Sequence, residues 1–157
     1  MSVAEGKKAP EFKLAGSDGK NHALADYAGK TVVLYFYPKD DTPGCTKEAC
    51  GFRDLSNDLA ARNAVVLGVS RDSVESHDKF ISKFNLPFVL LSDPEARVMT
   101  KYGAYGKKMM YGKEVEGVIR STVVIGPDGK IIKHWAKVPK AEAHPEKVLE
   151  LIDSIAS

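Results

Sequence analysis

Two cysteines, Cys45 and Cys50, are the residues whose type and spacing point most directly to chemistry, and the chain has no others. Thr42 and Pro43 before Cys45 are typical of a helix start, with Thr42 as the N-cap and Pro43 at the first helical position. Cys45 would then lie at the third position, where free backbone N–H groups and the positive end of the helix dipole favour the thiolate. The sequence therefore predicts a nucleophilic cysteine, with the Thr42 hydroxyl near the sulfur and near a substrate oxygen.

The five-residue spacing of the two cysteines limits how they can form a disulfide. On an ideal helix their Cα atoms would be ~8.6 Å apart, beyond the ~7 Å that a disulfide can bridge. Oxidation to a disulfide therefore requires residues 42–52 to unwind. We predict that Cys45 is oxidised while the helix is intact and that Cys50 attacks the oxidised sulfur after unwinding. Two simpler interpretations stay open, in which Cys45 is a small apolar residue at a helix start and Cys50 is a core residue.

The other groups that could bind a metal or a nucleotide lack the necessary spacing. A zinc site needs two or more ligands beyond the cysteines, and the four histidines stand singly in the sequence. We expect these four at the surface: His22, His77, His134 and His144. The glycine-rich segments at 103–106 and 126–129 lack the spacing of phosphate-binding loops and are predicted to be turns. No metal or other cofactor is expected.

Apolar segments along the chain predict the elements that would position the cysteines. Residues 31–37 are β-branched or aromatic on both faces, as in a central strand, and helical spacing follows from 43 to 63. Further strands are predicted at 64–69 and 88–91, helices at 73–84, 93–102 and 146–155, and hairpins at 10–20 and 121–135. This alternation predicts an α/β fold with a mixed sheet flanked by helices and an amino-terminal hairpin that covers one edge.

Length, composition and charge exclude several classes of protein. The 157 residues predict one domain spanning 1–157, and 43% hydrophobic residues are enough for a core. A net charge of +2 is too small for the basic surface that nucleic acids or anionic membranes require, so neither partner is expected. No apolar run approaches the ~18 residues of a membrane span, and the first residues lack the pattern of a secretion signal. We therefore expect a cytoplasmic protein.

The segment from Pro38 to Cys45, which reads PKDDTPGC, resembles the P-x-x-x-T-x-x-C signature of the peroxiredoxins. Within that family, Cys50 and its neighbours, ACGFRD, are similar to the bacterioferritin comigratory protein, or peroxiredoxin Q, branch. The similarity extends from residues 9–12 to residues 126–130. The resemblance implies a thioredoxin-like fold and a thiol-specific peroxidase that reduces hydrogen peroxide and organic hydroperoxides in antioxidant defence.

The same resemblance implies roles for five residues. Cys45 would be the peroxidatic cysteine, which becomes a sulfenic acid, and Cys50 the resolving cysteine, which forms an intramolecular disulfide with it. Thr42 would bind the substrate oxygens and Pro38 would shield the sulfenic acid. Arg120, which its sequence surroundings alone would assign to the surface, would stabilise the thiolate and the polarised peroxide. Thioredoxin or a similar dithiol would reduce the disulfide, and a monomer is expected because the chain has no late cysteine to resolve a partner subunit.

Two other functions use a cysteine pair. A redox switch that changes a partner-binding surface on oxidation would react slowly with peroxide and would not turn over. A general dithiol–disulfide oxidoreductase would reduce protein disulfides such as those of insulin, but such proteins use a C-x-x-C spacing. The spacing in this chain therefore favours the peroxidase.

Overall fold

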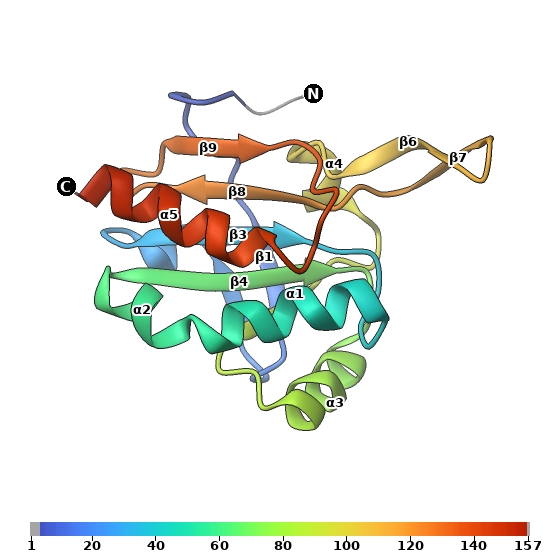
Figure 1. Ribbon diagram of the computed structural model, residues 1–157, viewed down its shortest axis with the longest axis horizontal. Helices are drawn as coiled ribbons and strands as arrows, with labels where there is room; N and C mark the ends of the chain where they lie inside the picture. Colours follow the sequence, from blue (N-terminus) through green and yellow to red (C-terminus); the bar gives the residue numbers. More distant parts are fainter. Residues whose placement is uncertain (1–3, 157) are drawn as a thin grey trace.

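The computed structural model describes residues 4–156, which form a seven-stranded sheet, a separate two-stranded sheet and helices around them (Figure 1). The strands are β1 (Lys13–Gly16), β2 (Asn21–Ala23), β3 (Thr31–Phe36), β4 (Ala64–Ser70), β5 (Val89–Ser92), β6 (Tyr105–Met110), β7 (Lys113–Val118), β8 (Ser121–Ile125) and β9 (Ile131–Trp135). The large sheet has the order β2-β1-β5-β4-β3-β8-β9, with β3, β4 and β5 parallel and the other pairs antiparallel. The predicted mixed sheet is confirmed, and the amino-terminal hairpin β1–β2 covers the edge of β5 as expected.

Helices cover both faces of the large sheet. They are the 3-10 helix η1 (Leu24–Tyr27) and the α-helices α1 (Pro43–Asp54), α2 (Ser56–Ala61), α3 (Val74–Phe84), α4 (Arg97–Lys101) and α5 (His144–Ala156). On one face, Phe52 of α1, Phe80 of α3 and Val148 of α5 share a buried cluster with Tyr35 of β3. Met99 of α4 belongs to a second buried cluster on the opposite face. Within residues 4–156, no helix is both long enough and apolar enough to cross a membrane.

The strand β3 lies inside the sheet because its residues are apolar or β-branched on both faces, and all six are buried. Val32 and Leu34 point into one core cluster, and Val33 and Tyr35 point into the other. β3 pairs in parallel with β4, so the carboxyl ends of the two strands lie at the same edge of the sheet. The helix α1, which carries both cysteines, begins at this edge after a short loop.

Two predicted helices differ from the observed ones. The helix predicted from 43 to 63 is interrupted at Leu55, whose φ of −100° and ψ of 6° separate α1 from α2. The helix predicted from 93 begins only at Arg97, because Ala96 adopts a left-handed conformation with φ 57°. Ala96 is the N-cap residue, and the Asp93 carboxylate before it accepts hydrogen bonds from the backbone N–H groups of Arg97 and Met99 in the first turn.

The hairpin β6–β7 was not predicted. Apolar and polar residues alternate only weakly in its sequence, and its described side chains are mostly exposed or partly exposed. It therefore lacks the apolar pattern of a core strand. The turn consists of Tyr111 and Gly112, both with positive φ, a pair of values that suits a tight hairpin turn. The hairpin projects from the body of the molecule (Figure 1) and exposes Met109 and Tyr111.

Candidate active site

The loop after β3 positions Cys45 at the third residue of α1, as predicted. Thr42 is the N-cap residue, with extended backbone angles, and Pro43 follows at the first helical position. The Thr42 hydroxyl, however, bonds no helix N–H group and instead donates to the carbonyl oxygen of Lys39 at 2.8 Å. Its oxygen lone pairs therefore stay available to accept a hydrogen bond. Cys45 itself is only 1% exposed, so a substrate must be small at the point where it reaches the sulfur.

Arg120 lies beside Cys45, although 75 residues separate them in the sequence. It lies in the link between β7 and β8, and its Nη2 donates to Cys45 Sγ at 3.2 Å. Its Nη1 donates to Glu48 Oε1 at 2.8 Å. Gly44 leaves room for this contact, because a Cβ atom there would lie 3.2 Å from Nη2. A fixed cation that contacts the sulfur favours the thiolate over the thiol.

Glu48 is a site residue that the sequence analysis missed. It follows Cys45 by three positions on α1, its side chain is 0% exposed, and it forms the ion pair with Arg120. Its second carboxylate oxygen has no hydrogen-bond partner within the described residues. Burial raises the pKa of the Glu48 carboxyl to about 7, and the nearby Arg120 guanidinium opposes this shift without cancelling it. The three-residue spacing, which puts two side chains on one helix face, is the signal that could have identified it.

Cys50 lies on the same unbroken helix as Cys45, and both thiols are free. Cys50 is partly exposed, whereas Cys45 is buried. The next residue, Gly51, packs so closely on α5 that a Cβ atom there would lie 2.8 Å from Cγ of Pro145. The segment that must unwind to form the predicted disulfide is therefore also a packed contact between α1 and α5.

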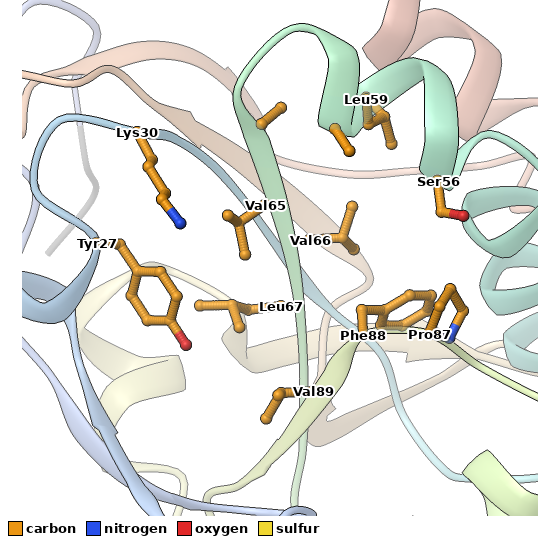
Figure 2. Close-up of a pocket in the computed structure, with 12 residues that line it drawn as sticks. Tyr27, Lys30, Ser56, Leu59, Val65, Val66, Leu67, Pro87, Phe88 and Val89 are labelled. Atoms are coloured by element: carbon orange, nitrogen blue, oxygen red, sulfur yellow. The ribbon is translucent and has the colours of Figure 1, made fainter.

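Pro38 and Arg120 both line a cavity of about 420 Å³ that opens next to the site. The neighbours of Arg120 and two other segments complete its wall with apolar side chains and lysines: Val118, Ile119, Lys107, Lys108, Met109, Lys137 and Val138. Another cavity, of about 320 Å³, is lined by Tyr27, Lys30 and residues near the start of β4 and β5 (Figure 2). It lies toward the amino ends of the parallel strands, at the opposite edge of the sheet from Cys45. Of these two cavities, the first contains Pro38 and Arg120 and is therefore the one beside the Cys45 site.

The expectation that the histidines lie at the surface is wrong for two of them. His77 is 0% exposed and His144 is 3% exposed. His77 contacts Asp40 and the carbonyl oxygen of Leu91, and His144 bonds the Thr122 hydroxyl at 2.8 Å. A lone histidine gives no periodic signal of burial, so these partners could not be read from the sequence. Among residues 4–156, no group of three or more histidine, cysteine or acidic side chains could hold a metal ion.

Comparison with known proteins gives a consistent result over nearly the whole chain. The model of the AhpC/TSA family matches residues 5–134. A putative peroxiredoxin bcp of Coxiella burnetii is 49% identical over 149 residues, which cover 95% of this chain and 98% of that protein. Peroxiredoxin Bcp of Bacillus subtilis is 46% identical over 156 residues, with 99% of each chain covered.

Solved structures agree with the sequence relatives. A peroxiredoxin Q structure from Xanthomonas campestris superposes with a TM-score of 0.87 at 40% identity and covers 93% of this chain and 92% of that chain. A mutant of PrxQ from Xylella fastidiosa gives a TM-score of 0.93 at 38% identity, with 100% and 99% covered. These similarities confirm the predicted thioredoxin-like fold. The chain belongs to the AhpC/TSA family, as a peroxiredoxin of the Bcp or peroxiredoxin Q type.

Proposed function

We propose that this thiol peroxidase reduces hydroperoxides at Cys45. The Cys45 thiolate attacks the terminal oxygen of the peroxide, the O–O bond breaks, and a sulfenic acid forms. The leaving oxygen takes a proton and departs as water or an alcohol. The observation that carries this assignment is the contact of 3.2 Å between Arg120 Nη2 and Cys45 Sγ, because it brings a fixed cation to a buried sulfur at a helix start.

The proposal gives each neighbouring residue a distinct task. Arg120 stabilises the thiolate and the negative charge that develops on the leaving oxygen. Thr42 accepts a hydrogen bond from the peroxide, because its own hydroxyl hydrogen is directed to Lys39. Pro38, in the wall of the cavity, limits the access of water to the sulfenic acid.

Cys50 completes the cycle. After α1 unwinds, the Cys50 thiolate attacks the sulfenic sulfur, hydroxide leaves and becomes water, and an intramolecular disulfide forms. A dithiol such as thioredoxin then reduces the disulfide by exchange and becomes oxidised. A monomeric state and a cytoplasmic location belong to the same proposal, and sedimentation and cell fractionation test them.

The first experiment compares the wild type with Cys45→Ser and Cys50→Ser. The rate of the first oxidation is measured by competition with a haem peroxidase for hydrogen peroxide, and turnover is measured with thioredoxin, its reductase and NADPH. We expect Cys45→Ser to lose both activities, and Cys50→Ser to keep the first oxidation while losing turnover with thioredoxin. Mass spectrometry of the oxidised wild type should show a disulfide between Cys45 and Cys50. Peroxide consumption by Cys45→Ser at the wild-type rate would overturn the assignment.

A further inference from the structure

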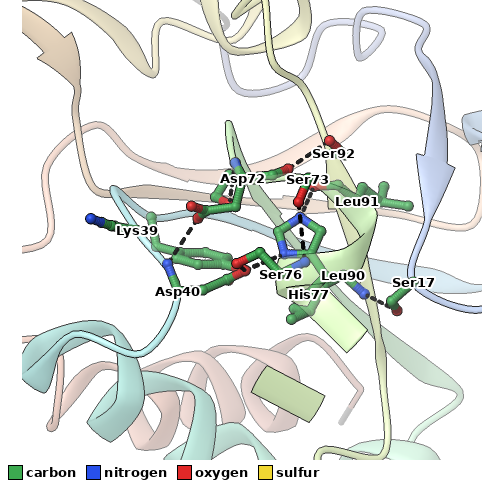
Figure 3. A network of polar contacts seen from close by, with 12 residues as sticks. Ser17, Lys39, Asp40, Asp72, Ser73, Ser76, His77, Leu90, Leu91 and Ser92 are labelled. Atoms are coloured by element: carbon green, nitrogen blue, oxygen red, sulfur yellow. Dashed lines mark hydrogen bonds and ion pairs between the residues drawn. The ribbon is translucent and has the colours of Figure 1, made fainter. Parts of the chain in front are cut away.

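A buried polar cluster beside the cysteine helix has no task in the chemistry described above. It joins Asp40, from the loop between β3 and α1, to Ser76 and His77 of α3 (Figure 3). The Asp40 side chain is 4% exposed and the His77 side chain 0% exposed. Burying charged groups at this depth is costly unless they are paired and hydrogen-bonded. The cluster is therefore a specific arrangement rather than a solvated contact.

The contacts of His77 define its orientation. Asp40 accepts hydrogen bonds from the Tyr37 hydroxyl at 2.5 Å and the Ser76 hydroxyl at 2.8 Å, and lies 2.7 Å from His77 Nδ1. His77 Nε2 lies 2.9 Å from the carbonyl oxygen of Leu91, which can only accept. Both ring nitrogens of His77 therefore have a polar partner, one on the loop and one on β5. The imidazole thus links the loop carboxylate to β5.

The loop that contains Asp40 needs such support. The Asp40 N–H group also donates to Asp72 Oδ2 at 2.8 Å, so both backbone and side chain are held. The next residue, Asp41, has φ 56°, a left-handed conformation that costs energy for a residue other than glycine. A strained backbone persists when surrounding contacts determine it. Asp40 supplies those contacts two residues before the Thr42 cap.

We propose that His77 and Asp40 are positioning residues for peroxide reduction, because the buried contact between them holds the loop from Pro38 to Thr42 in place before Cys45. The inference rests on the proposed roles of Pro38, Thr42 and Cys45. Asp40 lies midway between the first two in the sequence, so release of its carboxylate would move both relative to the sulfur. The groups that favour the thiolate, Arg120 and the amino end of α1, do not contact His77. Loss of the pair should therefore slow the attack on peroxide without reducing the general reactivity of the thiolate.

Two variants of one residue separate positioning from packing. In His77→Asn, the amide nitrogen lies near the place of Nδ1 and can still donate to Asp40. In His77→Gln, the amide nitrogen lies near the place of Nε2 and can donate to Leu91 but not to Asp40. Both variants remove the buried ring, so each serves as the packing control for the other. Circular dichroism and urea unfolding establish that each variant is folded.

Two rates are then measured for each reduced variant. The first is the reaction with hydrogen peroxide, by competition with a haem peroxidase, and the second is the alkylation of Cys45 by iodoacetamide, followed by mass spectrometry. We expect His77→Gln to react with peroxide about tenfold more slowly or worse, because small misplacements of a site have such effects. His77→Asn should stay within about threefold of the wild type, and alkylation should be unchanged in both.

Three results would overturn the inference: a wild-type peroxide rate in His77→Gln, an equal fall in His77→Asn, or a parallel fall in alkylation. If either variant fails to fold, Ser76→Ala is used in place of the two His77 variants. It removes one hydrogen-bond donor to Asp40 at a partly exposed position. This change should slow the peroxide reaction about threefold with unchanged alkylation, and an unchanged peroxide rate would overturn the inference. Failure of the proposed function would be distinguishable, because the wild type itself would then react with peroxide no faster than a free thiol.

Discussion

Arg120 connects the Cys45 sulfur to the buried Glu48 carboxylate through the two ends of one guanidinium. The planar group donates along fixed directions, so the contact with Glu48 also fixes the direction of the contact with Cys45. A lysine ammonium is a point charge and cannot define both directions at once. At the scale of single residues, the site therefore depends on the geometry of Arg120 as well as on its charge.

Arg120→Lys tests this dependence. It keeps the positive charge but removes the fork, and we expect the rate of reaction with hydrogen peroxide to fall about 100-fold. The matched control is Arg97→Lys, because the Arg97 side chain is 79% exposed and pairs with Glu95, which is exposed as well. The control should keep the wild-type rate. A rate in Arg120→Lys within about twofold of the wild type would show that charge alone is sufficient.

The buried Glu48 carboxyl predicts a dependence of stability on pH. Its pKa is raised from 4.5 to about 7 in the folded protein, so between these values the folded state binds more protons than the unfolded state. Its contribution to stability is complete below the unfolded pKa and is lost as pH rises through the folded pKa.

Glu48→Gln removes this titration. From about pH 5 to about pH 8, we expect the wild type to lose stability relative to Glu48→Gln by on the order of 2 kcal/mol. Urea unfolding of both reduced proteins at the two pH values measures the difference. A difference that does not change with pH would contradict the assignment of the titration to Glu48.

At the scale of elements, α1 has two opposed requirements. It is helical in the structure and holds Cys45 at its amino end, and in the proposed cycle it must unwind for Cys50 to reach the oxidised sulfur. The close contact of Gly51 with Pro145 links this transition to α5. Unwinding of α1 would break this contact, so the packing of α5 opposes unwinding in the reduced protein.

Gly51→Ala should lower the free energy of unfolding although alanine favours helices. Overpacking costs about 1–3 kcal/mol, more than the roughly 1 kcal/mol gained in helix propensity. The matched control is Gly106→Ala, since no atom lies within 4 Å of a Cβ at Gly106. Urea unfolding of the reduced proteins makes the comparison, and a Gly51→Ala protein more stable than the wild type would show that the contact is loose.

The strands that are buried on both faces were the most predictable elements. β3 and β4 combine continuous apolar sequence with β-branched residues, and no helix pattern competes with it. β6 and β7 pair only with each other, so no core face marks their sequence. The break at Leu55 was also not predictable, because it depends on how two helical segments pack rather than on a local breaker such as proline.

At the scale of the whole molecule, the site joins segments that are distant in the chain. Local sequence was enough to place Cys45 and Thr42, since capping acts over a few residues. The position of Arg120 depends on the path of the chain between β7 and β8. Arg120 was identified as a candidate site residue only through the family resemblance. The ion pair of Glu48 with Arg120 and the contact of His77 with Asp40 are seen only after folding, because the partners are 72 and 37 residues away in the sequence.

His144 gives the molecule a second pH dependence, of opposite sign. Burial lowers the pKa of its imidazole from 6.5 to about 4. As pH falls, the unfolded state takes up this proton before the folded state does. The contribution of neutral His144 to stability is therefore complete above about pH 6.5 and is lost as pH falls toward 4. In His144→Gln, urea unfolding between about pH 7 and about pH 5 should show a smaller loss of stability than in the wild type. An equal loss in both proteins would assign the dependence to other groups.

The same histidine faces the only tryptophan of the chain. The rings of Trp135 and His144 are perpendicular, with centroids 4.9 Å apart. Because burial keeps His144 neutral near pH 7, protonation of the imidazole does not alter the fluorescence of Trp135 in that range. His144 immediately precedes Pro145, which rests on Gly51 beside Cys50. If the proposed unwinding of α1 separates it from α5, we expect the fluorescence of Trp135 to change with it, so the transition can be followed without an added label.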